Sequence, residues 1–349
     1  ILAIGAFSLH FFDRTRVSTA IFYLFSLLVL LAMALRGTGT GLADYDAYIR
    51  IYESIIDWNY VVNPTTHVEI GFRIISFFGN TFNLGGQFII AFMAFASFIP
   101  VAFIIQKYSP YKLLSLLVWL PYIMSMNMQA SRISVAVGFG VVFFICFYKK
   151  QKVLSLLFFI IAISFHTSLI LLVATFLTRI RLSWLIGVYF TGFILSFLIG
   201  FMTLFSEMLS LVGLDFIAVK FLSYVNSDLY GYPMSAYDPR ILISIFMVTS
   251  IALVKNKITD QFHTYLLKLF VIGSIILIVF MDVTILAWRL SYIFLIISIL
   301  VSPILLQYFL SYLRRSQRLM GLIFPLTYFS LSFMMALMAK PYILFLEIS

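Results

Sequence analysis

Residues 149–181 read KKQKVLSLLFFIIAISFHTSLILLVATFLTRIR. Basic residues close both ends of an apolar stretch, 153–177, whose 25 residues contain one polar break at 165–168. Because loops rich in Lys and Arg stay in the cytoplasm, both ends are expected inside. The stretch is then either a single span that violates this rule or a pair of half-length helices that turns at His166. Short broken helices are tolerated only where protein or a water-filled cavity covers the backbone, so His166 at such a turn would face a cavity.

The rest of the chain has the same apolar character. Of its 349 residues, 63% are hydrophobic and 10% are charged. A soluble domain carries about 25% charged residues, so a soluble protein is excluded. A spanning helix needs roughly 20 apolar residues, which leaves room for about eleven or twelve crossings. We predict an all-α, polytopic integral membrane protein with a single transmembrane domain over residues 1–349 and with some short or re-entrant helices.

Basic clusters set the expected topology. The clusters expected inside are Arg14/Arg16, Lys107/Lys112, Lys149/Lys150/Lys152, Arg179/Arg181, Lys255/Lys257 and Arg314/Arg315/Arg318. The spans expected from hydropathy are 17–35, 84–106, two helices that turn near 124–129, then 182–205, 240–254, 264–281, 285–310 and 320–338. Two longer loops, 36–83 and 206–239, are expected outside, and residues 1–12 are interpreted as a first helix cut short by the numbering.

The charge and cysteine content exclude other classes. The net charge is +10, but the cations lie in short loops between helices rather than on one folded face. They indicate topology, and we expect no nucleic-acid partner. The lone Cys146 lies in an apolar run, which excludes a disulfide framework and a cysteine metal site.

Most of the remaining charged residues fall at the expected outer face. They are Arg36, Asp44, Asp46, Glu69, Arg73, Arg132, His166, Asp238, Arg240, Asp282 and Arg289. A charge at membrane depth costs roughly 2.5–3.5 kcal/mol on insertion scales, so such residues mark substrate sites, relays or ion pairs. Arg132 and Arg289 are the strongest candidates, because both lie inside apolar runs. Arg36 also fits an interfacial anchor, and Asp282 could neutralise Arg289 on one helical face.

The first outside segment contains a glycine run followed by acidic and aromatic residues. Residues 36–48 read RGTGTGLADYDAY. A helix that starts near Asp44 would stack Asp44 and Tyr48 one turn apart. The pattern 44–46 (Asp-Tyr-Asp) matches the Asp-x-Asp pattern of metal-binding sugar transferases, but two residues are a weak match and we expect no metal. Glu69 and Arg73 are spaced i and i+4, which favours a simple ion pair.

Several motifs together resemble a known family. Their residues are Arg36, Gly37, Gly41, Asp44 and Tyr48, then Glu-x-Gly-Phe at 69–72, Arg132 at the start of a helix, and Phe-His-x-Ser at 165–168 after the Lys-rich 149–152. This ordered set looks like the EpsG/Wzy-type polysaccharide polymerases, which join O-antigen or exopolysaccharide repeat units. The resemblance covers roughly residues 17–180, and either Asp44 or Asp46 fills its acidic position.

The resemblance implies an integral-membrane glycosyltransferase at the outer face of the bacterial cytoplasmic (inner) membrane. Its substrates would be undecaprenyl-diphosphate-linked oligosaccharides, and membrane lipids would surround it. A chain-length regulator protein would be a further partner. The resemblance implies no cofactor. Fixed cations stabilise a departing diphosphate, which fits Arg132 with Arg36, Arg73 and Arg289. His166, Asp44 or Glu69 would be the base, and Tyr45 and Tyr48 would offer flat surfaces to sugar rings.

Three alternatives remain open from the residues. A glycan (O-antigen) ligase would transfer finished polymer with the same chemistry. A lipid-linked sugar exporter should show two related halves and ionisable groups near mid-membrane, and neither is evident. A non-catalytic subunit of an assembly machine would need no cluster of arginine, histidine and acid at one depth.

Overall fold

The computed structural model describes residues 16–37, 43–64, 68–128, 131–211, 213, 215–227, 231–312 and 323–337. Within these ranges the chain is built from helices joined by turns and short loops, as predicted for an all-α membrane protein. The predicted truncated helix at residues 1–12 and the greater part of the glycine run, 38–42, lie outside the described residues.

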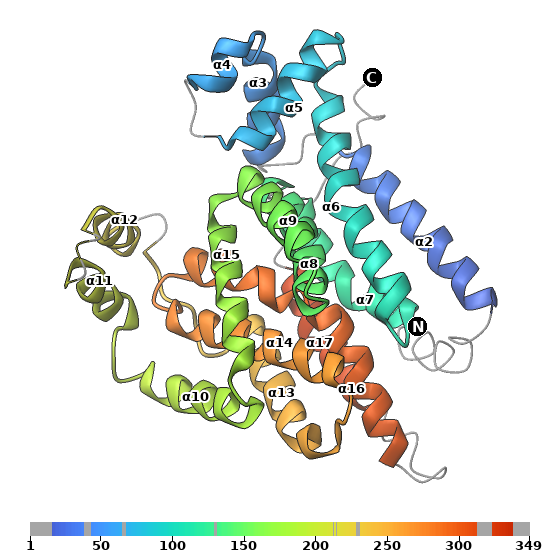
Figure 1. The fold of residues 1–349 in the computed structure, drawn as a ribbon, viewed down its shortest axis with the longest axis vertical. Coiled ribbons are helices and arrows are strands. Elements are labelled where there is room, and N and C mark those ends of the chain that lie inside the picture. The colour runs from blue at the N-terminus through green and yellow to red at the C-terminus, as the bar shows by residue number, and fades with distance from the viewer. Residues whose placement is uncertain are drawn as a thin grey trace.

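Apolar helices form the body of the molecule (Figure 1). Their bounds in chain order are α2 Arg16–Ala34, α6 Gln87–Tyr108, α7 Lys112–Tyr122, α8 Ser131–Tyr148, α9 Lys152–Phe165, α10 Leu182–Leu195, α11 Phe201–Leu211, α12 Asp215–Val225, α13 Pro239–Val254, α14 Gln261–Val279, α15 Thr284–Leu295, α16 Ser298–Tyr312 and α17 Ile323–Leu337. Three shorter segments are a π-helix, η1 (Ile123–Asn127), and two 3-10 helices, η2 (Thr167–Arg179) and η3 (Lys255–Lys257).

The expected outside segment 36–83 folds into three helices at one end of the molecule. They are α3 (Ala43–Ser54), α4 (Trp58–Val62) and α5 (Ile70–Thr81), and they lie together at the top of Figure 1, where α6 also begins. Asp57 caps α4, because its side chain accepts hydrogen bonds from the backbone N–H groups of Asn59 and Tyr60. The cap fixes the start of α4, and α3 and α5 both contact α6.

The stretch 153–177 folds back at His166, so the structure confirms the pair of short helices. α9 runs one way and η2 returns beside it. In a 3-10 helix residues three apart eclipse each other, and η2 follows this period: Leu169, Leu172 and Thr175 are all buried. A 3-10 helix rises about 2.0 Å per residue against 1.5 Å for an α-helix. η2 therefore spans a longer distance along its axis than an α-helix with the same number of residues.

Other predicted spans are shorter or bent. Span 182–205 ends early, since α10 stops at Leu195 and α11 starts separately at Phe201. Span 285–310 is divided into α15 and α16, whose axes differ by 56°. Among the described helices, three are long and apolar enough to cross a membrane, and counting the bent pair gives four. The four consecutive segments α9, η2, α10 and α11 have only 14, 13, 14 and 11 residues, so the prediction of some short helices is confirmed.

The turn predicted near 124–129 is formed by the π-helix η1. Pro121 lies inside α7 and lacks the N–H that an α-helical ladder needs. The following turn widens, and the N–H of Met128 donates to the carbonyl of Ile123 at 2.9 Å. α8 begins three residues later, so η1 sets where the first turn of α8, with Arg132, enters the molecule.

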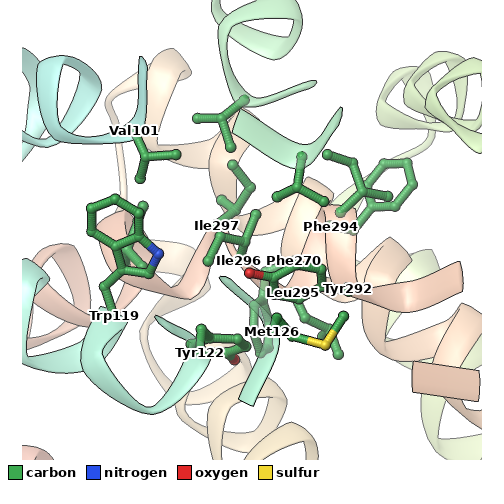
Figure 2. Close-up of a cluster of buried hydrophobic side chains, with 14 of the residues drawn as sticks. Val101, Trp119, Tyr122, Met126, Phe270, Tyr292, Phe294, Leu295, Ile296 and Ile297 are labelled. Carbon is green, nitrogen blue, oxygen red and sulfur yellow. The ribbon is translucent and has the colours of Figure 1, made fainter. Parts of the chain in front are cut away.

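Aromatic and branched side chains from distant helices pack the core (Figure 2). Trp119 of α7 stacks on Phe98 of α6 at 4.6 Å between ring centroids. Between membrane helices, association depends on close packing more than on apolar burial. Gly138 allows this closeness, because a Cβ there would lie 2.9 Å from the carbonyl oxygen of Ser97 on α6. α6 and α8 are thereby held in contact beneath the α3–α5 group.

Candidate active site

An ion pair between Glu69 and Arg132 connects the α3–α5 group to the apolar body. Glu69 is the residue before α5, and Arg132 lies in the first turn of α8. A guanidinium nitrogen of Arg132 donates to the Glu69 carboxylate, and the two side chains are 23% and 15% exposed for Arg132 and Glu69 respectively. The predicted pair of Glu69 with Arg73 is wrong. Glu69 is the N-cap of α5 with extended backbone, its carboxylate pairs with Arg132, and the Arg73 side chain binds the carbonyl of Val61 instead.

The three specified residues of the Glu-x-Gly-Phe motif make different contacts at this junction. Glu69 pairs with Arg132. Gly71 lets α5 touch α9, because a Cβ at Gly71 would lie 2.8 Å from the carbonyl oxygen of Ser164. Phe72 is fully buried and contacts the ring of Tyr48 at 5.6 Å between centroids. The motif therefore holds α5 against α9 two residues before His166.

The ring of Tyr48 contacts the guanidinium of Arg132. The guanidinium carbon of Arg132 lies 5.7 Å from the centroid of the Tyr48 ring, within the range of a cation–π interaction. The predicted stacking of sugars would use Tyr45 and Tyr48, and both rings are buried, at 5% and 4% exposure. The arrangement gives Tyr48 a positioning contact with the arginine.

His166 lies in the turn between α9 and η2. Its Nδ1 accepts a hydrogen bond from the N–H of Ser168 at 3.3 Å and lies 2.6 Å from the Ser168 hydroxyl. Because Nδ1 accepts, the proton of a neutral ring is on Nε2. Burial disfavours the charged ring, and the positive charges of Arg132 and Arg289 act in the same direction. At neutral pH His166 is therefore an uncharged hydrogen-bond donor beside two cations.

Arg289 reaches the same site from the second half of the chain. It lies in α15 and is half-buried. The suggested neutralisation by Asp282 does not occur, since the helix is not continuous between them: α15 starts at Thr284. Asp282 instead accepts a hydrogen bond from the N–H of Met202 at 3.0 Å and thereby caps α11.

Arg36 is deeply buried rather than exposed at an interface. It is 3% exposed, and its guanidinium donates to the carbonyl of Met128, which follows η1. Gln87, at the start of α6, donates to the carbonyls of Ala34 and Arg36 at 2.7 and 3.1 Å. It also accepts from the Tyr45 hydroxyl at 2.7 Å. Arg36 thus connects the end of α2 to the end of η1, which precedes α8 and Arg132.

Gln87 is the residue that sequence reasoning missed. Its signal was an uncharged polar side chain that opens a long apolar helix. In the structure this amide joins α2, α3 and α6 through three hydrogen bonds.

Arg73 connects α5 to α4. Its Nη1 donates to the carbonyl of Val61, the last but one residue of α4. Its Nε is buried and has no hydrogen-bond partner within the described part of the chain. The Arg73 side chain therefore binds α4 rather than the Glu69 carboxylate, although the Arg73 N–H donates to the Glu69 carbonyl at 3.3 Å.

The acidic pattern at 44–46 lies in the first turns of α3. The side chain of Asp44 lies outside the described part, while Asp46 is exposed. Positions two apart on a helix do not face each other, which disfavours a shared metal ion. The described residues contain no group of three or more His, Cys, Asp or Glu side chains that could hold a metal.

A second charged pair, Arg240 and Asp238, contacts Trp288, the neighbour of Arg289 in sequence. Arg240 of α13 donates to Asp238 through Nε and Nη2 at 2.7 and 2.6 Å. Its guanidinium carbon also lies 5.3 Å from the centroid of the Trp288 ring. Arg240 and Asp238 pair with each other, and Arg289 is the α15 cation whose charge acts on His166.

The comparisons with known proteins identify a family. The model of the EpsG family matches residues 19–347, nearly the whole chain and far beyond residue 180. No curated protein and no solved structure gives a significant match.

Proposed function

Because the chain belongs to the EpsG family, we propose that it is a membrane glycosyltransferase that polymerises oligosaccharide repeat units carried on undecaprenyl diphosphate. It would act at the outer face of the bacterial cytoplasmic membrane. Family membership supports the role of polysaccharide polymerase. The single observation that supports the chemistry is the Glu69–Arg132 pair beside His166.

The two arginines and the histidine form a suitable site for a diphosphate. Guanidinium groups bind phosphate oxygens with paired donors, and Arg132 and Arg289 provide two of them. His166 adds the Nε2–H donor. Fixed donors aimed at a departing anion stabilise the charge that develops on it. Undecaprenyl diphosphate, the proposed leaving group, is such an anion.

Glu69 is the base that the geometry supports. In the proposed reaction a hydroxyl of the incoming unit attacks the anomeric carbon at the reducing end of the growing chain. The new C–O bond forms as the bond from that carbon to the diphosphate oxygen breaks, and the hydroxyl proton passes to a carboxylate. A diphosphate on Arg132 would displace Glu69 from its ion pair and free it for this proton. Asp44 is the second candidate for the base.

The glycan profile of cells that lack the protein tests this function. A polymerase predicts loss of long chains and survival of lipid anchors capped with a single repeat unit. Loss of all capping of the lipid anchor would instead identify a ligase. Accumulation of lipid-linked repeat units at the inner face of the membrane would identify an exporter. Complementation with the wild-type chain is the control.

Cysteine labelling tests the outer placement. In a Cys146→Ser background, an impermeant thiol reagent should label Arg50→Cys, on α3, in intact cells. It should label Gln151→Cys, between α8 and α9, only after the membrane is opened. Labelling of Gln151→Cys from outside would contradict the proposed orientation.

A further inference from the structure

A groove lies at the end of the molecule opposite the turn at His166. It is bounded by α8, α9, η2 and α14 and encloses about 780 Å³, within the roughly 300–1,000 Å³ of ligand pockets. Most of its wall is aromatic or aliphatic, and includes Phe143, Phe147, Phe159, Val173 and Phe176. The groove therefore offers a continuous apolar surface for a hydrocarbon chain.

Three cations line the same groove. They are Lys150 and Lys152, at the turn between α8 and α9, and Arg179, at the end of η2. The guanidinium of Arg179 lies 5.2 Å from the ring of Phe176, so one cation is in contact with the apolar wall. No acidic residue lines the groove among the described residues. The combination is complementary to a molecule with one apolar part and one anionic part.

The backbone at Lys150 gives a second reason to assign a role to its side chain. Lys150 has φ 56°. Its N–H donates to Phe147 and the N–H of Gln151 donates to Cys146, each at 3.0 Å. This pattern is a Schellman motif, in which the left-handed position favours glycine. A lysine there is strained, and what it adds over glycine is a cation at the groove.

We propose that this groove binds one anionic glycerophospholipid. An acyl chain lies along the aromatic wall, and the phosphate contacts Lys150, Lys152 and Arg179. A neutral lipid would need no cations, and free phosphate would need no apolar wall. Because the groove shares no residue with the Glu69–Arg132 site, the proposal does not depend on the proposed function.

Native mass spectrometry of the full chain tests the proposal. Protein from nanodiscs that contain equal phosphatidylglycerol and phosphatidylcholine should retain one phosphatidylglycerol. Lys150→Gly combined with Lys152→Gln should weaken retention roughly tenfold or more, because two charges are lost. Glycine suits the turn at residue 150, so this variant should fold. Lys255→Gln with Lys257→Gln, a basic pair outside the groove, is the matched control and should retain the lipid.

A substitution in the wall tests the apolar half of the site. Val173→Trp should fill the groove and reduce retention, whereas Val153→Trp, at an exposed position outside the lining, should not. Equal retention of the two lipids would overturn the proposal, as would equal loss in both lysine variants. Preference for a polyprenyl phosphate, or binding of glycerol phosphate alone, would also overturn it, since the occupant would then be a different molecule.

Discussion

The two halves of the chain contribute to the candidate active site in different ways. In the first half, the charged side chains lie where helices end or break: Arg36 after α2, Glu69 before α5, Arg132 in the first turn after η1, and His166 between α9 and η2. The second half supplies Arg289 from the middle of α15, one limb of the bent pair α15–α16. Broken backbone within a membrane is tolerated only where protein or a water-filled cavity covers it. The first half therefore presents its candidate site residues at helix ends, whereas the second half adds one side chain from the middle of a helix.

The largest expected effect is that of Glu69→Gln. Loss of a base costs about 10²- to 10⁴-fold in rate. Removal of the carboxylate also frees Arg132, so KM for the lipid-linked substrate should not rise. The measurement is kcat and KM of purified enzyme in nanodiscs, with gel analysis of the polymer. Glu53→Gln, at an exposed position on α3, is the matched control.

A different outcome would change the base assignment. If Glu69→Gln retains wild-type kcat while Asp44→Asn is inactive, the proton passes to Asp44. Normal rates for both variants would remove the carboxylate base from the mechanism.

Arg132→Lys should lower activity about 10²- to 10³-fold, the usual cost of losing one preorganised donor to a developing anion. An ammonium keeps the charge but not the planar pair of donors. The assay is polymer formation at matched protein level, with Arg50→Lys, which is exposed on α3, as control. Normal polymerisation by Arg132→Lys would show that a point charge suffices.

His166→Ala should lose about tenfold to a hundredfold in kcat, because one hydrogen bond to a charged group is removed. Burial and the charges of Arg132 and Arg289 favour the neutral ring. The pH profile of kcat/KM should therefore have no acid limb from His166 between roughly pH 5 and 8. An acid limb present in the wild type and absent from His166→Ala would assign the base role to this histidine.

Asp282→Ala tests the supporting role of the second half. It should destabilise the protein by about 1 kcal/mol, the typical value of a lost helix cap, because the N–H of Met202 loses its acceptor. The polymerisation rate of folded enzyme should not change. Thermal unfolding in detergent gives the first quantity, and the nanodisc assay the second. A rate loss above tenfold in folded protein would place Asp282 in the reaction site.

The smallest expected effect is that of a chelator. The arginines already supply the positive charge that one diphosphate needs, so a divalent ion would add charge beyond that requirement. Full activity of wild-type enzyme in excess chelator is expected. Loss of activity that added metal restores would reopen the Asp-x-Asp interpretation of 44–46.

Sequence reasoning succeeded where local chemistry decides the structure. The turn at His166, with basic residues at both ends of the stretch, followed from hydropathy and charge. The partner of Glu69 did not follow from the sequence. It depends on α5 starting at Ile70, so that Glu69 is the N-cap, and on the contact of α5 with α9. The burial of Arg36 and the bridging by Gln87 are likewise tertiary, and a single sequence does not encode them in a local pattern.

The 3-10 geometry of η2 has a mechanical consequence for His166. Rewinding its 13 residues as an α-helix would shorten the segment by about 6 Å. With Arg179 held at the far end, such a change would draw the imidazole toward Arg179 and away from Arg132. The distance between the imidazole and the arginine is therefore set by the pitch of the helix that follows His166.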